Sequence, residues 1–548
     1  MLGKVFDKLL HENEEEIVGQ PVNAHHPDHK NEIIKPKKFN RKNVLTALVI
    51  FSLAVAIRFL SLYFVTDPQN AGAEVWYSDV YHHWQIAYLS KTIGFDRGFL
   101  RLWDLKGMEY FWGLMHPLIG ALLITLTGST SILVFRILSL VMGSFSVVLI
   151  FLLGRRYWNY QVGLAAAVFA LFNPVGIFND ASGMVEPLGI FLMLLGIYFL
   201  PLIPLLSGCL LAMASMTRAE YWILSLIVLV GAIFLTHKKH LGDKTFLFIG
   251  YLIPIVFYMK YLLNWTGNAI YPVWWNYLGN AKGDWQANIP PTLEQLMVQK
   301  IYWAIAIVSL FGLFAILVKR PRFTPLALFG LGNWFMWGVV IGMTKYLLSY
   351  LPRFWVDRIM IWPYMFLGLT IAVILFYFLP KKILKHTSIY TSVLGWGIVV
   401  VIVFIAQFAW MTIHKYYDPT HKYWDNFAAI ADEFSQVDTK DGKVLLPPDY
   451  PPLVYMLVEK QGLTGDRIVG QMFDPFYYLE KDVFTNWTYN RDSVLDWFSE
   501  EDIRLVFFFG NNENYKRLVK TEPEIFNLVK YDETRNLSFY EVRLENID

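Results

Sequence analysis

The sequence predicts an α-helical polytopic membrane protein, with about eleven transmembrane helices and a C-terminal extracytoplasmic α/β domain. Apolar runs of about 20 residues, the length that crosses a bilayer as a helix, recur along most of the chain. Hydrophobic residues make up 55% of the 548 residues and charged residues only 17%, which is unusual for a soluble protein of this size. Beyond residue 412 the long apolar runs stop, and shorter strand-like and helix-like runs replace them.

The positions of Lys and Arg predict the orientation of the chain in the cell membrane. Basic residues at 35–42 precede the first apolar run, which predicts a cytoplasmic polar tail at 1–43. Four later basic clusters also fall on the cytoplasmic side if the spans are 44–65, 131–153, 160–178, 187–201, 204–217, 221–236, 245–263, 301–318, 323–343, 358–379 and 388–412. This assignment makes 44–412 the transmembrane domain, with a long external loop at 66–130 and the C-terminus outside.

Residues 110–127 are apolar and long enough to form another span. A span there would move Arg155 and Arg156 to the outside, against the positive-inside rule. The step from His116 to Pro117 also interrupts a helix, because proline lacks a backbone donor. We therefore interpret 110–127 as a juxtamembrane or re-entrant element of the external loop.

Residues 413–548 have the alternation of a small soluble α/β domain. Strand-like runs at 443–446 and 505–509 alternate with helix-like runs at 423–434 and 452–460. The chain has one cysteine, which excludes an intrachain disulfide or a thiolate metal site. The formal net charge of +2 does not indicate a partner, and we expect a membrane environment and no nucleic acid.

The most informative stretch follows the first span, where Asp79, His82 and His83 lie among aromatic residues. Ionisable groups at a membrane boundary must be hydrated, paired or used, because burying them unpaired is costly. A solvated loop acid is the simpler interpretation of Asp79. Ordinary loop residues are the simpler interpretation of the two histidines, which are adjacent and therefore do not share one helix face.

The predicted topology places further ionisable residues on the same external side. They are Asp104, His116, Asp180, Glu186, Arg218, Glu220, Lys345, Arg353, Asp357 and Arg358. Simpler roles remain open for several of them. Glu186 could complement a helix dipole, Arg218 and Glu220 could form an interfacial ion pair, and Arg358 could be a snorkelling arginine at a helix end.

A set of acids and arginines at a membrane surface suits a lipid-borne phosphate substrate. A carboxylate can act as a base toward an acceptor hydroxyl or hold a hard divalent cation through oxygen. Arginine binds phosphate through paired donors and keeps its charge near the membrane. Outside the cytosol, the usual activated sugar donor is a polyprenyl-phosphate sugar.

Four short motifs carry a family resemblance: Ser78-Asp79-Val80-Tyr81, Met115-His116-Pro117-Leu118-Ile119-Gly120, Ser182-Gly183-Met184-Val185-Glu186 and Arg353-Phe354-Trp355-Val356-Asp357-Arg358. They resemble motifs of the GT-C superfamily of integral membrane glycosyltransferases over nearly all of 44–412. This superfamily includes oligosaccharyltransferase catalytic subunits, protein O-mannosyltransferases and aminoarabinose transferases. The second acidic motif departs from the family, since Leu188 replaces a glutamate. The Trp-Trp-Asp-Tyr-Gly motif of oligosaccharyltransferases is absent from 413–548, which favours transfer of a single sugar.

The resemblance implies a hexosyltransferase-type enzyme that moves a sugar from a polyprenyl-phosphate-linked donor to a lipid, glycan or protein acceptor on the extracytoplasmic face. It implies that Asp79 is the catalytic base or the acid that orients the acceptor. Glu186 would assist Asp79 or complete a site for Mg²⁺ or Mn²⁺ with it, and metal dependence stays open.

The other predicted site residues have binding and positioning roles. Arg358, Arg218 and Lys345 would hold the phosphate of the lipid donor. His116 would position the first loop, and His82 and Glu220 would also be positioning residues. The alternative is a transporter or flippase for a lipid-linked or polar solute, although the few charges in the predicted membrane interior and the large external domain argue against it.

Overall fold

The computed structural model describes residues 41–64, 79–93, 113–235, 241–274, 330, 332, 353–383, 389–414, 422–447, 451–469, 491–510 and 513–547. The chain divides into two compact units, Met1–Lys37 and Lys38–Asp548. The first unit lies outside the described residues, as do the predicted spans 301–318 and 323–343 apart from Gly330 and Gly332. The last residues of the predicted tail belong instead to the first described helix, which begins at Arg41.

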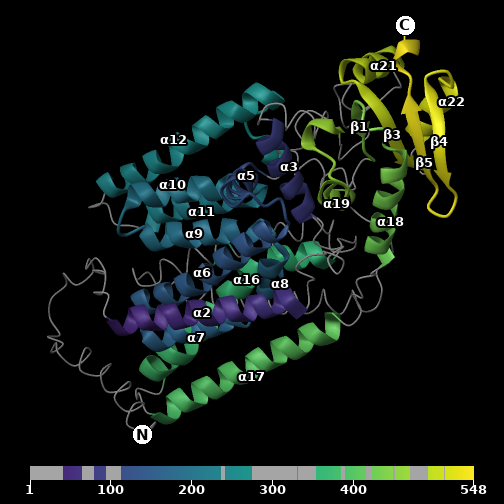
Figure 1. The fold of residues 1–548 in the computed structure, drawn as a ribbon. Helices are drawn as coiled ribbons and strands as arrows, with labels where there is room; N and C mark the ends of the chain where they lie inside the picture. Colours follow the sequence, from purple (N-terminus) through teal and green to yellow (C-terminus); the bar gives the residue numbers. More distant parts are fainter. Residues whose placement is uncertain are drawn as a thin grey trace. The chain divides into compact units, whose positions relative to one another are not determined.

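The membrane part of the second unit is helical (Figure 1). Its helices are α2 (Arg41–Phe64), α3 (Asp79–Ile93), α5 (Met115–Thr127), α6 (Leu133–Tyr157), α7 (Tyr160–Leu171), α8 (Pro174–Ser182), α9 (Glu186–Phe199), α10 (Pro204–Ser215), α11 (Ala219–Leu235), α12 (Leu241–Thr266), α16 (Arg353–Val373), the π-helix η6 (Ile374–Ile383) and α17 (Ile389–His414). Among the described residues, five helices are long and apolar enough to cross a membrane, or six if α7 and α8 form one bent span. The chain is thus an integral multi-pass membrane protein, and the span number of about eleven stays a prediction.

Several predicted spans are shorter or broken in the structure. The predicted span 160–178 is bent by 60° between α7 and α8, where Pro174 opens α8 and cannot donate to the preceding turn. The predicted spans 187–201 and 204–217 become helices of 14 and 12 residues. A rise of about 1.5 Å per residue leaves both short of the apolar thickness of a bilayer.

The ambiguous segment 110–127 forms α5, a helix of 13 residues, which is shorter than a span. Pro117 lies in the first turn of α5, where a missing N–H costs no intrahelical hydrogen bond. The His-Pro step therefore begins a helix rather than breaking one. Gly128 ends it in the left-handed conformation, and its N–H donates to the Ile124 carbonyl at 2.9 Å, as in an αL cap.

Two glycines allow α10 and α12 to approach each other closely. A Cβ on Gly208 of α10 would lie 2.6 Å from the backbone nitrogen of Tyr251 and in contact with the Leu247 carbonyl oxygen. A Cβ on Gly250 of α12 would lie 2.9 Å from the Leu205 carbonyl carbon. Neither backbone can move out of the way as a flexible side chain could, so packing at this crossing requires glycine.

Replacing Gly208 with alanine is therefore expected to destabilise the protein by about 1–3 kcal/mol through overpacking. The measurement is the thermal unfolding midpoint of the purified protein in detergent. Gly397→Ala in α17 is the matched control, because no atom lies within 4 Å of a Cβ added there. Equal midpoints for the two variants would contradict the close packing of α10 and α12.

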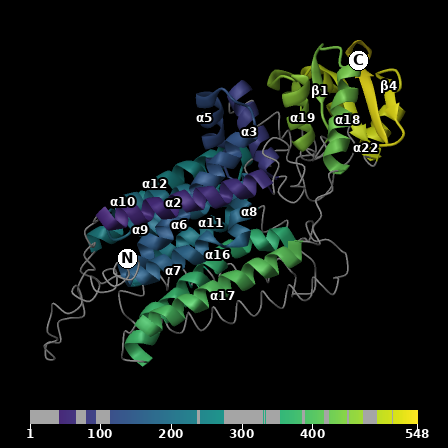
Figure 2. The same cartoon turned by 60° about the horizontal axis from the view of Figure 1, so that its bottom comes forward.

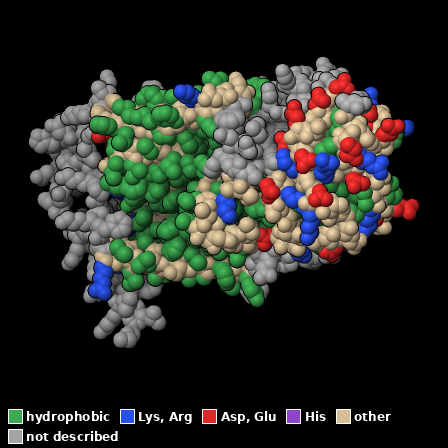
Figure 3. Space-filling view, turned by 45° about the horizontal axis from the view of Figure 1, so that its top comes forward, with side chains coloured by type: hydrophobic (Ala, Val, Ile, Leu, Met, Phe, Trp, Pro, Cys, Tyr) green, Lys and Arg blue, Asp and Glu red, His purple; other side chains and the backbone are tan. Residues whose placement is uncertain are grey.

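Hydrophobic side chains cover much of the visible surface of the helices, and acidic and basic side chains gather over the C-terminal region (Figure 3). Large apolar side chains exposed in this way include Phe257 of α12, at 71%, and Phe404 of α17, at 75%. Exposed apolar surface of this extent is stable against lipid rather than water.

The C-terminal region, residues 422–547, contains a mixed five-stranded sheet. Its elements are α18 (Lys422–Val437), β1 (Lys443–Leu445), α19 (Pro451–Gln461), the 3-10 turn η7 (Gly465–Arg467), β2 (Ile468–Val469), α21 (Arg491–Glu500), β3 (Ile503–Phe509), α22 (Glu513–Thr521), β4 (Phe526–Asp532), β5 (Leu537–Val542) and the 3-10 turn η8 (Leu544–Asn546). The strand order is β2-β1-β3-β5-β4. The pairs β1–β2 and β1–β3 are parallel, whereas β3–β5 and β4–β5 are antiparallel.

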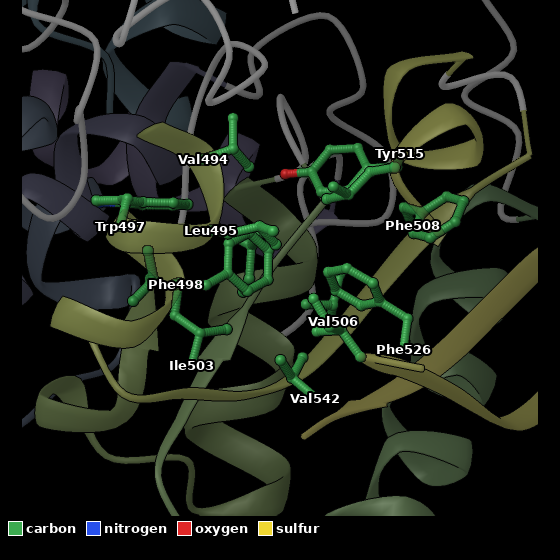
Figure 4. Close-up of a cluster of buried hydrophobic side chains, with 14 residues drawn as sticks. Val494, Leu495, Trp497, Phe498, Ile503, Val506, Phe508, Tyr515, Phe526 and Val542 are labelled. Atoms are coloured by element: carbon green, nitrogen blue, oxygen red, sulfur yellow. The ribbon is translucent and has the colours of Figure 1, made fainter. Parts of the chain in front are cut away.

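The core of the C-terminal region combines aliphatic and aromatic side chains (Figure 4). Phe508 of β3 stacks on Tyr515 of α22 and on Tyr540 of β5, with ring centroids 5.2 and 5.6 Å apart. The two strands and two helices predicted in this region are confirmed as β1, β3, α18 and α19.

Candidate functional site

Three of the predicted acids lie at the beginnings of helices. Asp79 is the first residue of α3 and Glu186 the first residue of α9, and Glu220 lies in the first turn of α11. A carboxylate is stabilised there by the partial positive charge of the helix N-terminus. The three helix N-termini therefore favour negative charge at these positions.

Arg358 of α16 joins the first two of these acids. Its Nη1 donates to Asp79 Oδ2 at 2.7 Å, and its Nε donates to Glu186 Oε1 at 2.6 Å. The Arg358 and Glu186 side chains are buried, at 4% and 5% exposure, whereas Asp79 is 26% exposed. Charge-assisted bonds of this length offset the cost of burying the guanidinium.

Arg218, which immediately precedes α11, extends the contacts. Its Nη1 donates to Glu186 Oε1, and its Nε and Nη2 donate to Glu220 at 3.0 and 2.8 Å. Asp79, Arg358, Glu186, Arg218 and Glu220 thus form one continuous set of ion pairs, which we call the charged network. Three carboxylates and two guanidinium groups give it a formal charge of −1, so it is nearly self-neutralising.

Asp79 is ionised at neutral pH. Burial raises its pKa, but Arg358 and, to a smaller extent, His82 and Arg218 lower it, and the pKa lies below its ordinary value. Burial lowers the pKa of His82 to about 4 against the opposing effect of Asp79, so His82 is neutral at pH 7. The first turn of α3 therefore presents a carboxylate next to an uncharged imidazole.

Two buried histidines pack behind this turn. The rings of His83 on α3 and His116 on α5 meet edge to face, with centroids 5.0 Å apart. The ring of Phe135 on α6 also contacts the ring of His116, with centroids 5.3 Å apart. Both histidines are fully buried. His116 of α5 thus contacts His83 of α3, and its role in positioning the first loop stays a prediction.

Other predicted residues lie elsewhere. Lys345, predicted to bind the donor phosphate, is outside the described residues. Asp180 does not join the charged network but pairs with Arg58 of α2, whose Nε donates to Asp180 Oδ2 at 2.7 Å. Sequence reasoning missed this pair, although an arginine within an apolar span indicates a buried partner.

Asp79 and Glu186 were predicted to hold Mg²⁺ or Mn²⁺ together. Both carboxylates instead contact Arg358, and the described ranges contain no group of three His, Cys, Asp or Glu side chains able to hold a metal ion. A hard divalent cation takes about six oxygen ligands. The described residues do not complete such a site, and metal dependence stays open.

Comparison with solved structures identifies the fold. The chain is similar to the archaeal oligosaccharyltransferase AglB from Archaeoglobus fulgidus in complex with an inhibitory peptide and a dolichol-phosphate. The superposition has a TM-score of 0.52 and a sequence identity of 10%, and it covers 93% of this chain and 75% of the AglB chain. The same enzyme tethered to an acceptor peptide containing the NVT sequon superposes with a TM-score of 0.51. The match covers 92% of this chain and 75% of the enzyme, also at 10% identity. The chain has the GT-C fold. This result confirms the predicted resemblance to the GT-C superfamily at the level of the fold.

A further match is the GT-C structure of ArnT from Cupriavidus metallidurans bound to undecaprenyl phosphate. It covers 91% of this chain and 97% of the ArnT chain at 12% identity, with a TM-score of 0.46. No family model and no curated protein sequence matches the chain.

Proposed function

We propose that this GT-C protein is a glycosyltransferase that moves a single sugar from a polyprenyl-phosphate-linked donor to an acceptor on the extracytoplasmic face. The proposal depends on one observation: within a GT-C fold, Arg358 donates hydrogen bonds to both Asp79 and Glu186. AglB is described in complex with dolichol-phosphate, which supports a polyprenyl phosphate as the carrier. The acceptor is a lipid, a glycan or a protein.

Asp79 suits the role of base toward the acceptor. It is the most exposed carboxylate of the charged network, at 26% against 5% for Glu186 and 15% for Glu220. In the proposed step, the acceptor oxygen forms a bond to the anomeric carbon while the bond from that carbon to the phosphate oxygen breaks. The hydroxyl proton passes to Asp79, and the departing polyprenyl phosphate keeps the bonding electrons.

Arg358 suits the stabilisation of the leaving phosphate. Its positive charge lies beside Asp79 and is buried, where a fixed charge acts on a transition state more strongly than in water. Glu186 would orient Arg358 and Arg218 by accepting from both, and Glu220 would fix Arg218 through two parallel hydrogen bonds. Lys345 keeps its proposed role as a further phosphate ligand.

The test uses the full chain in nanodiscs with radiolabelled polyprenyl-phosphate hexose and a membrane extract as the source of acceptors. Transfer of label into a new product, with release of polyprenyl phosphate, supports the proposal. Flux of the lipid-linked sugar across proteoliposomes without transfer would favour the transporter or flippase instead.

Chelation of divalent cations is expected to leave the transfer rate unchanged, because the guanidinium of Arg358 already supplies positive charge between Asp79 and Glu186. The measurement is the initial rate after dialysis against EDTA, with magnesium-saturated EDTA as the control. Loss of activity that Mg²⁺ or Mn²⁺ restores would mean that the two acids exchange the arginine for a cation during the reaction.

A further inference from the structure

Helix α3, which begins with Asp79, is enclosed on more than one side. It packs against α5 and also against α19 and η7 of the C-terminal region, and Figures 1 and 2 show it between α5 and α19. Every residue from Val80 to Ser90 is buried, including polar ones such as Gln85. A helix buried on all faces depends on each neighbour for its position.

Tyr455 of α19 makes the central contact with α3. Its ring packs edge to face against the rings of Tyr81 and Trp84, with ring centroids 5.3 and 4.9 Å apart. Trp84 in turn stacks on Tyr88 at 5.1 Å. Aromatic rings packed edge to face have a defined geometry, so Tyr455 fixes the first two turns of α3 in rotation as well as in distance.

The same face of α19 is attached to the segment that precedes α6. The Tyr455 hydroxyl accepts a hydrogen bond from the Ile132 N–H at 3.2 Å. Thr130 donates its hydroxyl to Glu459, and its carbonyl accepts from Trp84 Nε1 at 2.6 Å. Segment 130–132, α19 and α3 are therefore joined by polar contacts in addition to packing.

The turn η7 holds the second half of α3. A Cβ on Gly465 would lie 2.9 Å from Thr92 Cγ2 and 3.3 Å from Leu89 Cδ2. The backbone of Gly465 approaches this closely because it lacks a side chain. The C-terminal region thus contacts α3 near both of its ends.

From these contacts we propose that α19 is a positioning element, and that Tyr455 is a positioning residue which holds α3 where Asp79 meets Arg358. Tyr81 lies two residues beyond Asp79, so a shift of α3 away from α19 moves the carboxylate directly. The bond from Arg358 to Asp79 is 2.7 Å long, and a displacement of about 1 Å breaks a hydrogen bond of this kind. This inference rests on the proposed function for its effect on turnover, but not for its effect on α3.

The test compares Tyr455→Ala and Tyr455→Phe with Tyr531→Ala, a control on the exposed strand β4 of the same region. Tyr455→Ala is expected to lower kcat per folded molecule by about 10–100-fold, since small misplacements of a reacting group have effects of this order. The KM for the donor stays unchanged. Tyr455→Phe retains the ring contacts and recovers most of the rate.

The pH profile separates positioning from loss of folded protein. Asp79 is faced by Arg358 from α16, by Arg218 and by His82 of α3 itself. In Tyr455→Ala the carboxylate moves away from Arg358, and the acidic limb of kcat/KM shifts to higher pH. If the variant only contained fewer folded molecules, the whole kcat/KM profile would be lower and its acidic limb would not move. An unmoved limb together with a normal kcat per folded molecule overturns the inference.

Hydrogen exchange of the full chain in nanodiscs provides a second measurement that needs no activity. The amides of α3 are expected to exchange faster in Tyr455→Ala than in the wild type and in Tyr531→Ala. Unchanged exchange overturns the inference whatever the rate shows. Absence of transfer by the wild-type protein overturns the proposed function instead, and the two failures are thereby distinct.

Discussion

Replacing Asp79 with asparagine is expected to lower kcat of sugar transfer by about 10²–10⁴-fold, the usual effect of removing a general base. Asparagine has nearly the same size, and its amide oxygen can still accept from Arg358, but it cannot take the proton of the acceptor hydroxyl. The measurement is the initial rate of label transfer at equal amounts of folded protein. Asp441→Asn, at an exposed position of the C-terminal region, is the matched control.

Full activity of a well-folded Asp79→Asn protein would remove Asp79 from the mechanism and leave it as the partner of Arg358 alone. The pH dependence gives an independent check. The carboxylate is the active form and its pKa lies below the ordinary value, because the arginines and His82 outweigh burial. Activity that depends on Asp79 is therefore full above that ordinary value and is lost only as the pH falls through the lowered pKa.

Replacing Arg358 with leucine is expected to abolish transfer and to destabilise the protein by about 3–5 kcal/mol, the effect of removing one partner from a buried ion pair. The change leaves Asp79 without this partner, whereas Glu186 keeps Arg218. Arg358→Lys keeps the charge but cannot bond both acids through a rigid fork, so we expect a smaller loss of stability. Two quantities are measured for each variant: the thermal unfolding midpoint in detergent and the rate of sugar transfer.

Arg504→Leu is the matched control for Arg358→Leu. Arg504 also contacts two acids, Asp502 and Glu545, but its side chain is 41% exposed. Exposed pairs contribute about 0–1 kcal/mol. Equal midpoints for the two leucine variants would mean that Arg358 does not stabilise the helices as a buried partner.

The members of the charged network could be predicted from sequence, but their pairing could not. The predicted topology placed all five members on one side of the membrane, together with other ionisable residues such as Asp180, which pairs with Arg58 instead. The bonds among them join residues as far apart as 279 positions. Such contacts depend on tertiary packing, on which local patterns carry no information. The interposition of Arg358 between two acids predicted to hold a cation is a result of that packing.

The bend within the predicted span 160–178 was missed for a different reason. Hydropathy averages apolar content over a window, and it does not register a single residue that ends the hydrogen-bond ladder. Pro174 is visible in the sequence inside the predicted span 160–178, and it begins the new helix α8. In the C-terminal region, by contrast, short runs bounded by polar turns were sufficient to predict two strands and two helices.

The Arg58–Asp180 pair has a consequence for how the chain is assembled during synthesis. The two residues are 122 positions apart, so α2 leaves the ribosome long before its acidic partner exists. An arginine at the centre of a helix costs about 2.5–3.5 kcal/mol on insertion into lipid, and the cost is smaller for Arg58, which lies nearer the end of α2. The ion pair with Asp180 can offset this cost only after α8 has been synthesised, so α2 receives its buried partner from a much later part of the chain.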